Sequence, residues 1–278
     1  MLEIKSAEQY NEEVKLFRKN CSSVHTNCFL MGGEIEELIG KGRLFIERRP
    51  GWLFIVCDRD DYSNLYYYTD EGSNTDIFKE FTAENNDREF YVDIVTRNGR
   101  GDSITPQRLI DTSAVKKYKT YQRMQLLLKN IDFDSLEINI ADGYRAVNDY
   151  SDYDELISLW KECLDEKSTP LPSEEEVAKL SGEGKMFAVV TDEGKLAAVI
   201  VLTTSAKQGL LQHIVVSPEH RRKGLAASLM LSSFVTARNF GLTMLRLWVD
   251  CENHGAISLY ERVGFVNDGM DCDQLIVN

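Results

Sequence analysis

One segment constrains the fold of this chain more than any other: an apolar run that passes through a basic turn into a helical pattern. Residues 210–216 are apolar apart from Gln212 and His213, and the sequence Ser-Pro-Glu-His-Arg-Arg-Lys-Gly-Leu-Ala-Ala follows at residues 217–227. Beyond it, Leu231, Phe234 and Val235 recur at spacings of three and four, which is typical of a helix. The segment therefore predicts a strand, a basic glycine-containing turn and a helix in direct succession.

This turn has the chemistry of an anion site. The first N–H groups of a helix have no partner within the helix and carry the positive end of its dipole. Gly224 lets the backbone come close to an anion, and small residues follow it at Ala226 and Ala227. Positive charge is added at the same place by Arg221, Arg222 and Lys223. The turn is therefore predicted to bind a pyrophosphate group, and the alternative is an ordinary solvated helix start.

The spacing Arg-x-x-Gly-x-Ala after Val-x-Pro resembles the acetyl-CoA loop of the GNAT N-acetyltransferases. It fits neither the phosphate loop of nucleotide triphosphatases nor the Gly-x-Gly-x-x-Gly motif of dinucleotide-binding proteins. The resemblance implies an acetyl-CoA site whose loop consists of Arg221, Arg222, Lys223, Gly224, Leu225, Ala226 and Ala227.

A second motif follows the strand-like residues 244–249. Asn253, Ala256 and Tyr260 share one helix face, Gly264 ends the pattern, and Phe265 begins another apolar strand. In the GNAT family this motif supplies an Asn and a Tyr that meet the pantetheine arm and the thiol, so the resemblance implies these roles for Asn253 and Tyr260. Taken alone, Asn253 is equally an N-cap and Tyr260 a half-buried aromatic residue. The resemblance covers residues 140–278.

Composition sets outer limits on the function. A chain of 278 residues predicts two domains, and a net charge of −13 disfavours nucleic acid or anionic membranes as partners. The six cysteines show neither a Cys-x-x-Cys pair nor a Cys/His spacing typical of a metal site, so no metal is expected. The first residues contain no long apolar run, so we expect no signal peptide or membrane span and a reduced, cytoplasmic protein.

The chain also shows an internal repeat of pattern. Two β-branched and aromatic hairpins are predicted, at residues 51–69 and 184–203; each follows two helical patterns and precedes a further strand. In the first half a short helix at 106–111 and a strand at 118–124 then follow, without the basic loop or the Asn/Tyr motif. We therefore predict an α/β fold with mixed sheets, in which residues 140–278 form a GNAT domain and residues 1–130 a degenerate GNAT-like copy. The alternative for the first half is an unrelated α+β domain.

In the resembled family an amine attacks the acetyl thioester directly, which sets three chemical needs. The amine must be neutral although its pKa in water is about 10, the oxygen that gains charge needs a donor, and the departing thiolate needs a proton or a strong donor. The resemblance places the oxygen's donor among the main-chain N–H groups of Ile214, Val215 and Val216. Tyr260 is then the expected acid beside the sulfur.

The base is the open question. His213 is the titratable residue of the strand at 209–216, but simple alternation puts it on the face opposite Gln212, Ile214 and Val216. A β-bulge would change that parity. Trp248 stands where some relatives carry a Glu on the next strand. The catalytic candidates are therefore Tyr260 and His213, and a base acting through water or an acceptor that arrives neutral stays open.

The sequence thus predicts an N-acetyltransferase that uses acetyl-CoA and a primary amine of a cationic or neutral acceptor, either a small molecule or a peptide. One alternative is a CoA-binding sensor that has lost its chemistry. Another is a tandem aminoacyltransferase that uses aminoacyl-tRNA, against which the negative charge and the intact loop count. The acceptor's identity and the oligomeric state do not follow from the sequence.

Overall fold

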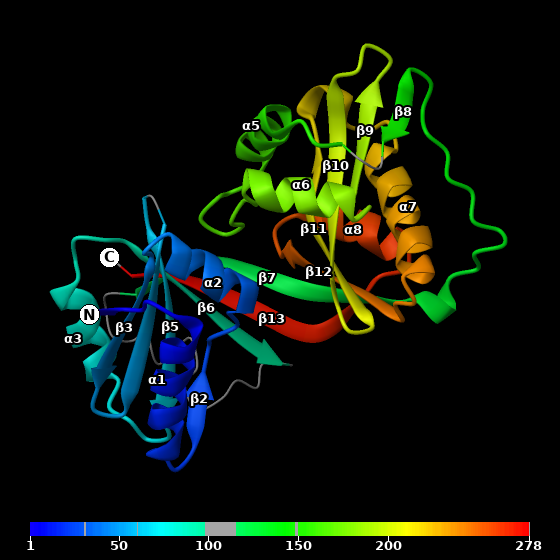
Figure 1. Cartoon of the computed structure of the whole chain (residues 1–278). Helices are drawn as coiled ribbons and strands as arrows, with labels where there is room; N and C mark the ends of the chain where they lie inside the picture. The colour runs from blue at the N-terminus through cyan, green and yellow to red at the C-terminus, as the bar shows by residue number, and fades with distance from the viewer. Residues whose placement is uncertain (31, 60, 98–114, 148–149, 278) are drawn as a thin grey trace. The chain divides into compact units, whose positions relative to one another are not determined.

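The computed structural model describes residues 1–30, 32–59, 61–97, 115–147 and 150–277, and the chain divides into two compact units (Figure 1). Unit 1 consists of Met1–Tyr121 and Gly269–Asn278, and unit 2 consists of Gln122–Asp268. The short helix expected at 106–111 lies outside the described residues.

Unit 1 is a sheet with helices on both faces. Its sheet order is β1-β3-β4-β5-β6-β13-β7, and β2 pairs with β5 outside this order. One buried cluster joins the sheet to α1 and α2, and another joins its opposite face to α3. The elements are β1 (Leu2–Glu3), α1 (Ala7–Lys19), β2 (Val24–Thr26), α2 (Gly32–Gly40), β3 (Leu44–Arg49), β4 (Trp52–Asp58), β5 (Ser63–Asp70), α3 (Asp76–Glu84) and β6 (Phe90–Arg97).

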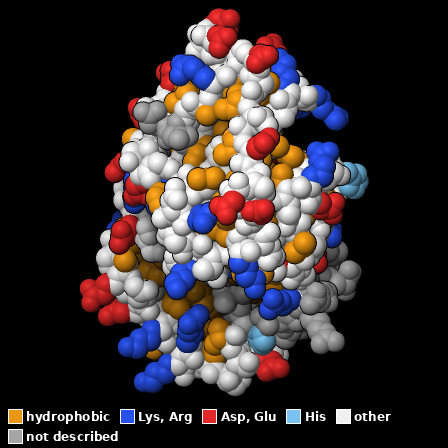
Figure 2. All heavy atoms as spheres, turned by 90° about the vertical axis from the view of Figure 1, so that its right-hand side faces the viewer, with side chains coloured by type: hydrophobic (Ala, Val, Ile, Leu, Met, Phe, Trp, Pro, Cys, Tyr) orange, Lys and Arg blue, Asp and Glu red, His pale blue; other side chains and the backbone are white. Residues whose placement is uncertain are grey.

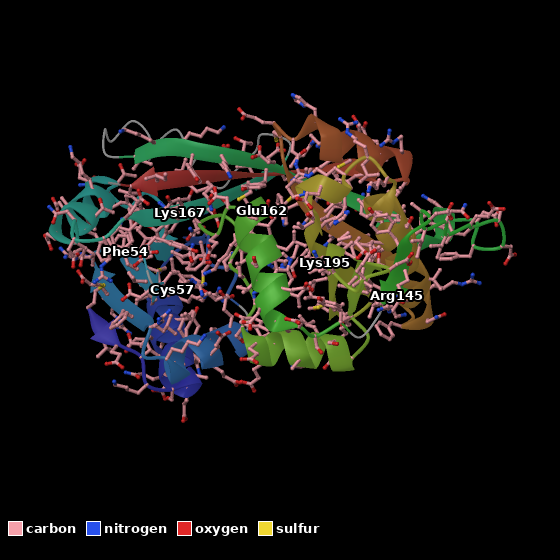
Figure 3. The ribbon with its side chains drawn as sticks, turned by 90° about the horizontal axis from the view of Figure 1, so that it is seen from above. Phe54, Cys57, Arg145, Glu162, Lys167 and Lys195 are labelled. Atoms are coloured by element: carbon pink, nitrogen blue, oxygen red, sulfur yellow. The ribbon has the colours of Figure 1, made fainter. Side chains whose placement is uncertain are left out.

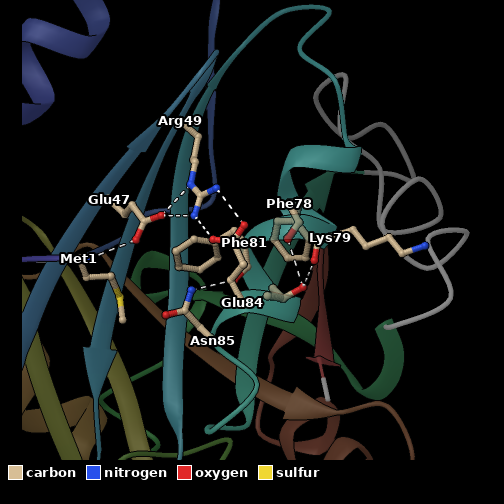
Figure 4. A network of polar contacts seen from close by, with 9 residues as sticks. Met1, Glu47, Arg49, Phe78, Lys79, Phe81, Glu84 and Asn85 are labelled. Atoms are coloured by element: carbon tan, nitrogen blue, oxygen red, sulfur yellow. Dashed lines mark hydrogen bonds and ion pairs between the residues drawn. The ribbon is translucent and has the colours of Figure 1, made fainter.

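Polar contacts fasten α3 to this sheet. The Arg49 guanidinium on β3 donates to Glu84 on α3, with Nη2 2.5 Å from Oε2, and to Glu47, with Nε 2.6 Å from Oε1 (Figure 4). Beneath it, Phe81 of α3 stacks on Phe54 of β4 with ring centroids 4.1 Å apart. Burial of these rings supplies the stabilisation, since a partly exposed ion pair adds only about 0–1 kcal/mol.

Two strands run from one unit into the other. β7 (Val115–Leu127) passes from unit 1 to unit 2 after Tyr121, and β13 (Val266–Val277) passes from unit 2 to unit 1 after Asp268. β13 pairs antiparallel with β6 from Met270↔Arg97 to Val277↔Phe90. The division therefore differs from the boundary expected at 130–140, because this ladder assigns the end of the chain to the first unit.

Unit 2 carries the sequence motifs. Its sheet order is β7-β12-β11-β10-β9-β8, with α5 and α6 packed on one face and α7 and α8 on the other. The elements are β8 (Tyr144–Val147), α5 (Tyr153–Cys163), α6 (Glu174–Gly182), β9 (Met186–Thr191), β10 (Leu196–Ser205), β11 (Gln208–Val216), α7 (Leu225–Asn239), β12 (Met244–Asp250) and α8 (His254–Arg262).

The helix starts of unit 2 follow from capping. The Ser173 hydroxyl accepts the Glu176 N–H at 3.3 Å, and the Glu176 carboxylate accepts the Ser173 N–H at 2.9 Å, a complete capping box for α6. Asp152 caps α5 by accepting the Glu155 N–H at 3.1 Å. Both helices thus begin with a side-chain cap that is followed by an acidic first turn.

The two units share one topology. In each, three strands pair antiparallel in succession, and the third pairs parallel with a strand that follows a helix: β3-β4-β5, α3 and β6 in unit 1, and β9-β10-β11, α7 and β12 in unit 2. The predicted repeat is confirmed, but the expected match of hairpins is off by one strand. The hairpin β4–β5 corresponds to β10–β11, so unit 1 retains a counterpart of the loop strand and a shorter counterpart of its helix.

Candidate active site

The basic turn has a left-handed backbone at two positions. β11 leads through a short 3-10 turn at Pro218–His220 to Arg222, with φ of 64°, and Gly224, with φ of 80°. Gly224 stands before α7 with no side-chain cap, and a Cβ added there would meet no heavy atom within 4 Å. Glycine is therefore favoured by its backbone angle, and the space above it is open.

A row of main-chain donors lines this turn. Among the described residues, nothing accepts a hydrogen bond from the consecutive N–H groups of residues 222–227, whereas the next N–H, of Ser228, donates to the Gly224 carbonyl at 3.1 Å. Unpaired N–H groups at a helix start, next to left-handed residues, form a concave anion site. The turn thus has the geometry that its sequence predicted.

The cations of the turn are exposed, and two of them are held by neutral groups. Arg221 Nε donates to the Val216 carbonyl at 3.2 Å. Lys223 Nζ donates to the Tyr144 hydroxyl, which lies 2.9 Å from His220 Nδ1. No described carboxylate pairs with Arg221, Arg222 or Lys223. Their charge is therefore available to an anion, and Tyr144 is a member of this cluster that sequence motifs did not indicate.

Beside the turn, β11 and β12 diverge. Their parallel pairing extends only from Gln208↔Met244 to Leu210↔Arg246, after which no described strand pairs with that edge of β11. An open edge exposes unpaired N–H and C=O groups. The Ser217 N–H donates to the Ala197 carbonyl, and the alternation of an antiparallel ladder then turns the amide of Val215 toward β10 and that of Val216 toward the open edge.

A β-bulge sits in the middle of β11. The β10–β11 register moves from Val199↔Val215 to Val201↔Gln212, so His213 and Ile214 stand opposite Ile200, and His213 has φ of 49°. His213 therefore lies on the face opposite Ile214 and Val216, as alternation predicted, but the bulge puts Gln212 on the face of His213, where alternation did not place it. Ile214 and Val216 pack against the buried cluster on the sheet face that α7 and α8 cover, which includes Phe234 and is called the α7 cluster below. Gln212 accepts from the Thr203 hydroxyl at 3.0 Å, and His213 packs against Trp160 of α5.

The surroundings of His213 define its tautomer. Its Nε2 lies 3.1 Å from the Pro170 carbonyl, in the loop between α5 and α6 that also carries Lys167 (Figure 3). A carbonyl only accepts, so Nε2 bears the proton and Nδ1 keeps its lone pair. Nδ1 is buried and has no hydrogen-bond partner in the described part of the chain. The ring centroids of His213 and Trp160 lie 5.2 Å apart, and burial lowers the pKa of His213. The ring is therefore neutral near pH 7.

The second motif lies on α8. The Asn253 side chain caps the helix by accepting the Ala256 N–H at 3.1 Å. Tyr260 is buried within the α7 cluster, 6.2 Å from Phe265 between ring centroids, and burial raises its pKa to about 12. No described group makes a hydrogen bond with its hydroxyl. Asn253 therefore has the capping role that its position allowed, and its amide nitrogen stays available to another group.

The comparisons with known proteins concern mainly this half of the chain. Residues 153–265 match the model of the acetyltransferase (GNAT) family. The [ribosomal protein bS18]-alanine N-acetyltransferase of Escherichia coli K12 is 32% identical over 93 residues, 34% of this chain and 63% of that protein's length. "Acetyltransferase SG1711" of Sodalis glossinidius is 26% identical over 42% of this chain and 82% of its own length.

Solved structures resemble more of the chain. A GCN5-related N-acetyltransferase from Sphaerobacter thermophilus has a TM-score of 0.62 at 17% identity, covering 81% of this chain and 76% of its own. A tandem GNAT protein from the clavulanic acid biosynthesis pathway has a TM-score of 0.60 at 15% identity, covering 84% and 83%. At these identities the likeness establishes the fold. No helix in the described ranges is both long and apolar enough to span a bilayer.

Proposed function

We propose that this chain, whose residues 153–265 match the GNAT family model, is an acyltransferase that moves the acetyl group of acetyl-CoA to a primary amine. The observation that carries the proposal is the row of unpaired N–H groups at residues 222–227 beside the open edge of β11. An anion site next to an unpaired strand edge suits a ligand with a pyrophosphate at one end and an amide-bearing arm.

The residues present fit acetyl-CoA. The N–H groups of 222–227, with Arg221, Arg222 and Lys223, would hold its pyrophosphate, and each charge-assisted hydrogen bond contributes about 1.5–3 kcal/mol. The open edge of β11 and the free amide of Asn253 would hold the pantetheine arm. When bound, acetyl-CoA supplies the acetyl group as an activated thioester.

Main-chain groups of β11 stabilise the charge that develops on the acetyl oxygen. The alternation that turns the N–H of Val215 toward β10 turns the N–H groups of Ile214 and Val216 toward the open edge. Among the three candidates, we therefore assign the donor role to Ile214 and Val216. Donors fixed in a folded strand need no reorganisation during the reaction, which is the source of their catalytic effect.

Tyr260 acts as a hydrogen-bond donor to the sulfur. Its pKa of about 12 lies about 3.5 units above that of an ordinary thiol, so complete transfer of its proton to a thiolate would cost about 5 kcal/mol. A donated hydrogen bond avoids that cost and still stabilises the leaving group. The attacking amine then provides the proton that the thiolate finally takes up.

His213 is the base that we assign on β11. Its ring is neutral and its Nδ1 lone pair is unused, which are the two chemical requirements of a base. Nδ1 is buried, so an acceptor's proton reaches it only through a water molecule or a movement of the Pro170 loop. The strained φ of 49° at His213 fits a position held for function, since such strain costs about 1–3 kcal/mol.

The acceptor is a primary amine with positive or zero net charge, because the chain carries a formal charge of −13 and the cations of the turn are committed to phosphates. The E. coli relative is named for a protein alanine, so peptides belong in the search beside small molecules. The six cysteines are all free thiols, which suits a reducing compartment such as the cytoplasm.

The test is an assay of free thiol released from acetyl-CoA by the full chain with a panel of cationic, neutral and anionic amines and peptides. We expect at least one cationic or neutral amine to give turnover, with the acetylated amine identified by mass spectrometry. Tight acetyl-CoA binding without turnover on any amine would instead support the second candidate, a CoA-binding sensor, which the burial of His213 Nδ1 favours.

The aminoacyl-tRNA alternative needs a basic surface. On the face shown in Figure 2, acidic side chains are interspersed among the basic ones. Phosphate contacts by clustered Lys and Arg dominate nucleic-acid affinity, so the mixture of charges gives that alternative no support.

A further inference from the structure

In unit 2, β11 and β12 diverge and leave a wedge-shaped gap, the wedge, where acetyl-CoA is proposed to bind. We propose that residues 22–27 of unit 1 permanently fill the corresponding wedge between β5 and β6, so that the first unit carries a segment of its own chain in place of a cofactor. This inference rests on the proposed function only where it treats the wedge of unit 2 as a cofactor site. The contacts that carry it lie within unit 1, and unit 2 serves as the comparison.

The strands of unit 1 diverge as those of unit 2 do. β5 and β6 pair in parallel only at Ser63↔Phe90 and Asn64↔Tyr91. β11 and β12, their counterparts, pair only from Gln208↔Met244 to Leu210↔Arg246. Both units therefore keep a wedge between the third strand and the strand that follows the helix.

In unit 1 a strand occupies the open edge. β2 pairs antiparallel with the far end of β5, from Val24↔Asp70 to Thr26↔Tyr68. The Thr26 hydroxyl adds a hydrogen bond to the Tyr67 carbonyl at 2.6 Å. The edge that stays open on β11 is thus satisfied on β5 by the chain itself.

Asn27 closes the wedge where the two strands part. Its side chain is 3% exposed, and its Nδ2 donates to the Leu65 carbonyl of β5 at 3.2 Å and to the Asp93 carbonyl of β6 at 3.1 Å. Its Oδ1 accepts the Tyr67 N–H at 2.7 Å. A carboxamide is suited to this place because it offers two donors and an acceptor together, matching two carbonyls and an N–H.

The Asp70 carboxylate lies at the open end of this wedge. At the end of β5 the Asp70 carboxylate accepts the N–H groups of Ser22, Ser23 and Glu71 at 2.9, 2.9 and 3.1 Å, and these bonds lower its pKa. The corresponding place in unit 2 is the basic turn. A charged carboxylate that already holds the local N–H groups both removes the donors and repels a phosphate.

Loss of the Asn27 side chain would remove these hydrogen-bond partners of the Leu65 and Asp93 carbonyls and of the Tyr67 N–H, which is costly where the groups are shielded from water. In the full chain without ligand, we expect the N–H of Tyr67 to be strongly protected from hydrogen exchange. In Asn27→Ala its exchange should accelerate at least about tenfold, and the melting temperature should fall by several degrees.

Two further variants make the test specific. Asn27→Asp keeps the acceptor for the Tyr67 N–H but loses both donors, so it should be nearly as harmful as Asn27→Ala. Asn85→Ala, which removes one hydrogen bond from Asn85 Nδ2 to the Phe81 carbonyl at the end of α3, is the matched control and should leave Tyr67 protected.

Rapid exchange of Tyr67 and of residues 24–26 in the unmodified chain would overturn the proposal, and this measurement stands even if an Asn27 variant fails to fold. Unchanged exchange in Asn27→Ala would overturn it equally. Acetyl-CoA binding is followed separately in the unmodified chain. Its complete absence would contradict the proposed function while the exchange pattern still decides the role of residues 22–27.

Discussion

Tyr260 shows at the residue scale how burial prepares a group for chemistry. Burial raises its pKa to about 12, so the hydroxyl keeps its proton at every pH at which the enzyme would be assayed. No described residue uses that hydrogen bond, which leaves it for a ligand.

We expect Tyr260→Phe to lower turnover by about 10²–10³, because it removes one donor that acts on the leaving group. Binding of acetyl-CoA, measured by calorimetry, should stay within a few-fold, since the ring that packs on Phe265 is kept. Tyr153→Phe, which removes a hydroxyl bonded to the Pro172 carbonyl in the same unit, is the control. An unchanged rate where chemistry limits turnover would reduce Tyr260 to a packed aromatic residue.

The lowered pKa of His213 predicts how the stability of the fold depends on pH. Its pKa is lowered in the folded state by burial, so the unfolded chain binds the proton more readily. Its contribution to stability is thus complete above the unfolded value of about 6.5 and is lost as the pH falls below it. His213→Asn, which tolerates the left-handed backbone, should therefore reduce the loss of stability between pH 7.5 and 5 in denaturant unfolding. The exposed His254 provides the control, and an equal effect of His254→Asn would contradict this account.

Alternation placed His213 correctly on the face opposite Ile214 and Val216, but the bulge that puts Gln212 on the same face as His213 could not be predicted, and the reason is local. Alternation assigns faces only while the strand stays regular, and the bulge depends on a left-handed backbone at a residue other than glycine, which the sequence of a strand does not signal. By contrast, Gly224 adopts the left-handed backbone that glycine favours, and its turn was predicted correctly.

At the scale of elements, the turn between β11 and α7 is the part of the site that the sequence specified best. Strand, basic turn and helix lie where the pattern predicted them, because each has a strong local signal. The repeat of hairpins had a weaker signal. Successive antiparallel strands look alike in sequence, so the pattern revealed the duplication of topology but not which strands correspond.

The turn itself is tested at Gly224. We expect Gly224→Asp to weaken acetyl-CoA binding at least about tenfold, because a carboxylate would project into the open space where the phosphates bind. Gly224→Asn has the same shape without the charge, and both residues tolerate a left-handed backbone, so it should weaken binding much less. Equal affinities of the two variants in calorimetry would contradict a role for charge at this position.

At the scale of the whole molecule, two units of one topology have diverged in opposite directions. Unit 2 keeps an open wedge and a basic turn. Unit 1 has a filled wedge, and the acidic residue Asp70 stands where unit 2 has its basic turn. That the last strand joins the sheet of unit 1 was not predictable, because alternation along β13 indicates which face is buried but not which strand is its partner.

We propose that acetyl-CoA binds to unit 2 alone, on the N–H groups of residues 222–227. The most direct measurement is hydrogen exchange of the full chain with and without saturating acetyl-CoA. We expect slower exchange at residues 211–216 and 222–227 and no change at residues 63–76, the corresponding strand and turn of unit 1. Slower exchange at 63–76, or none at 222–227, would contradict it.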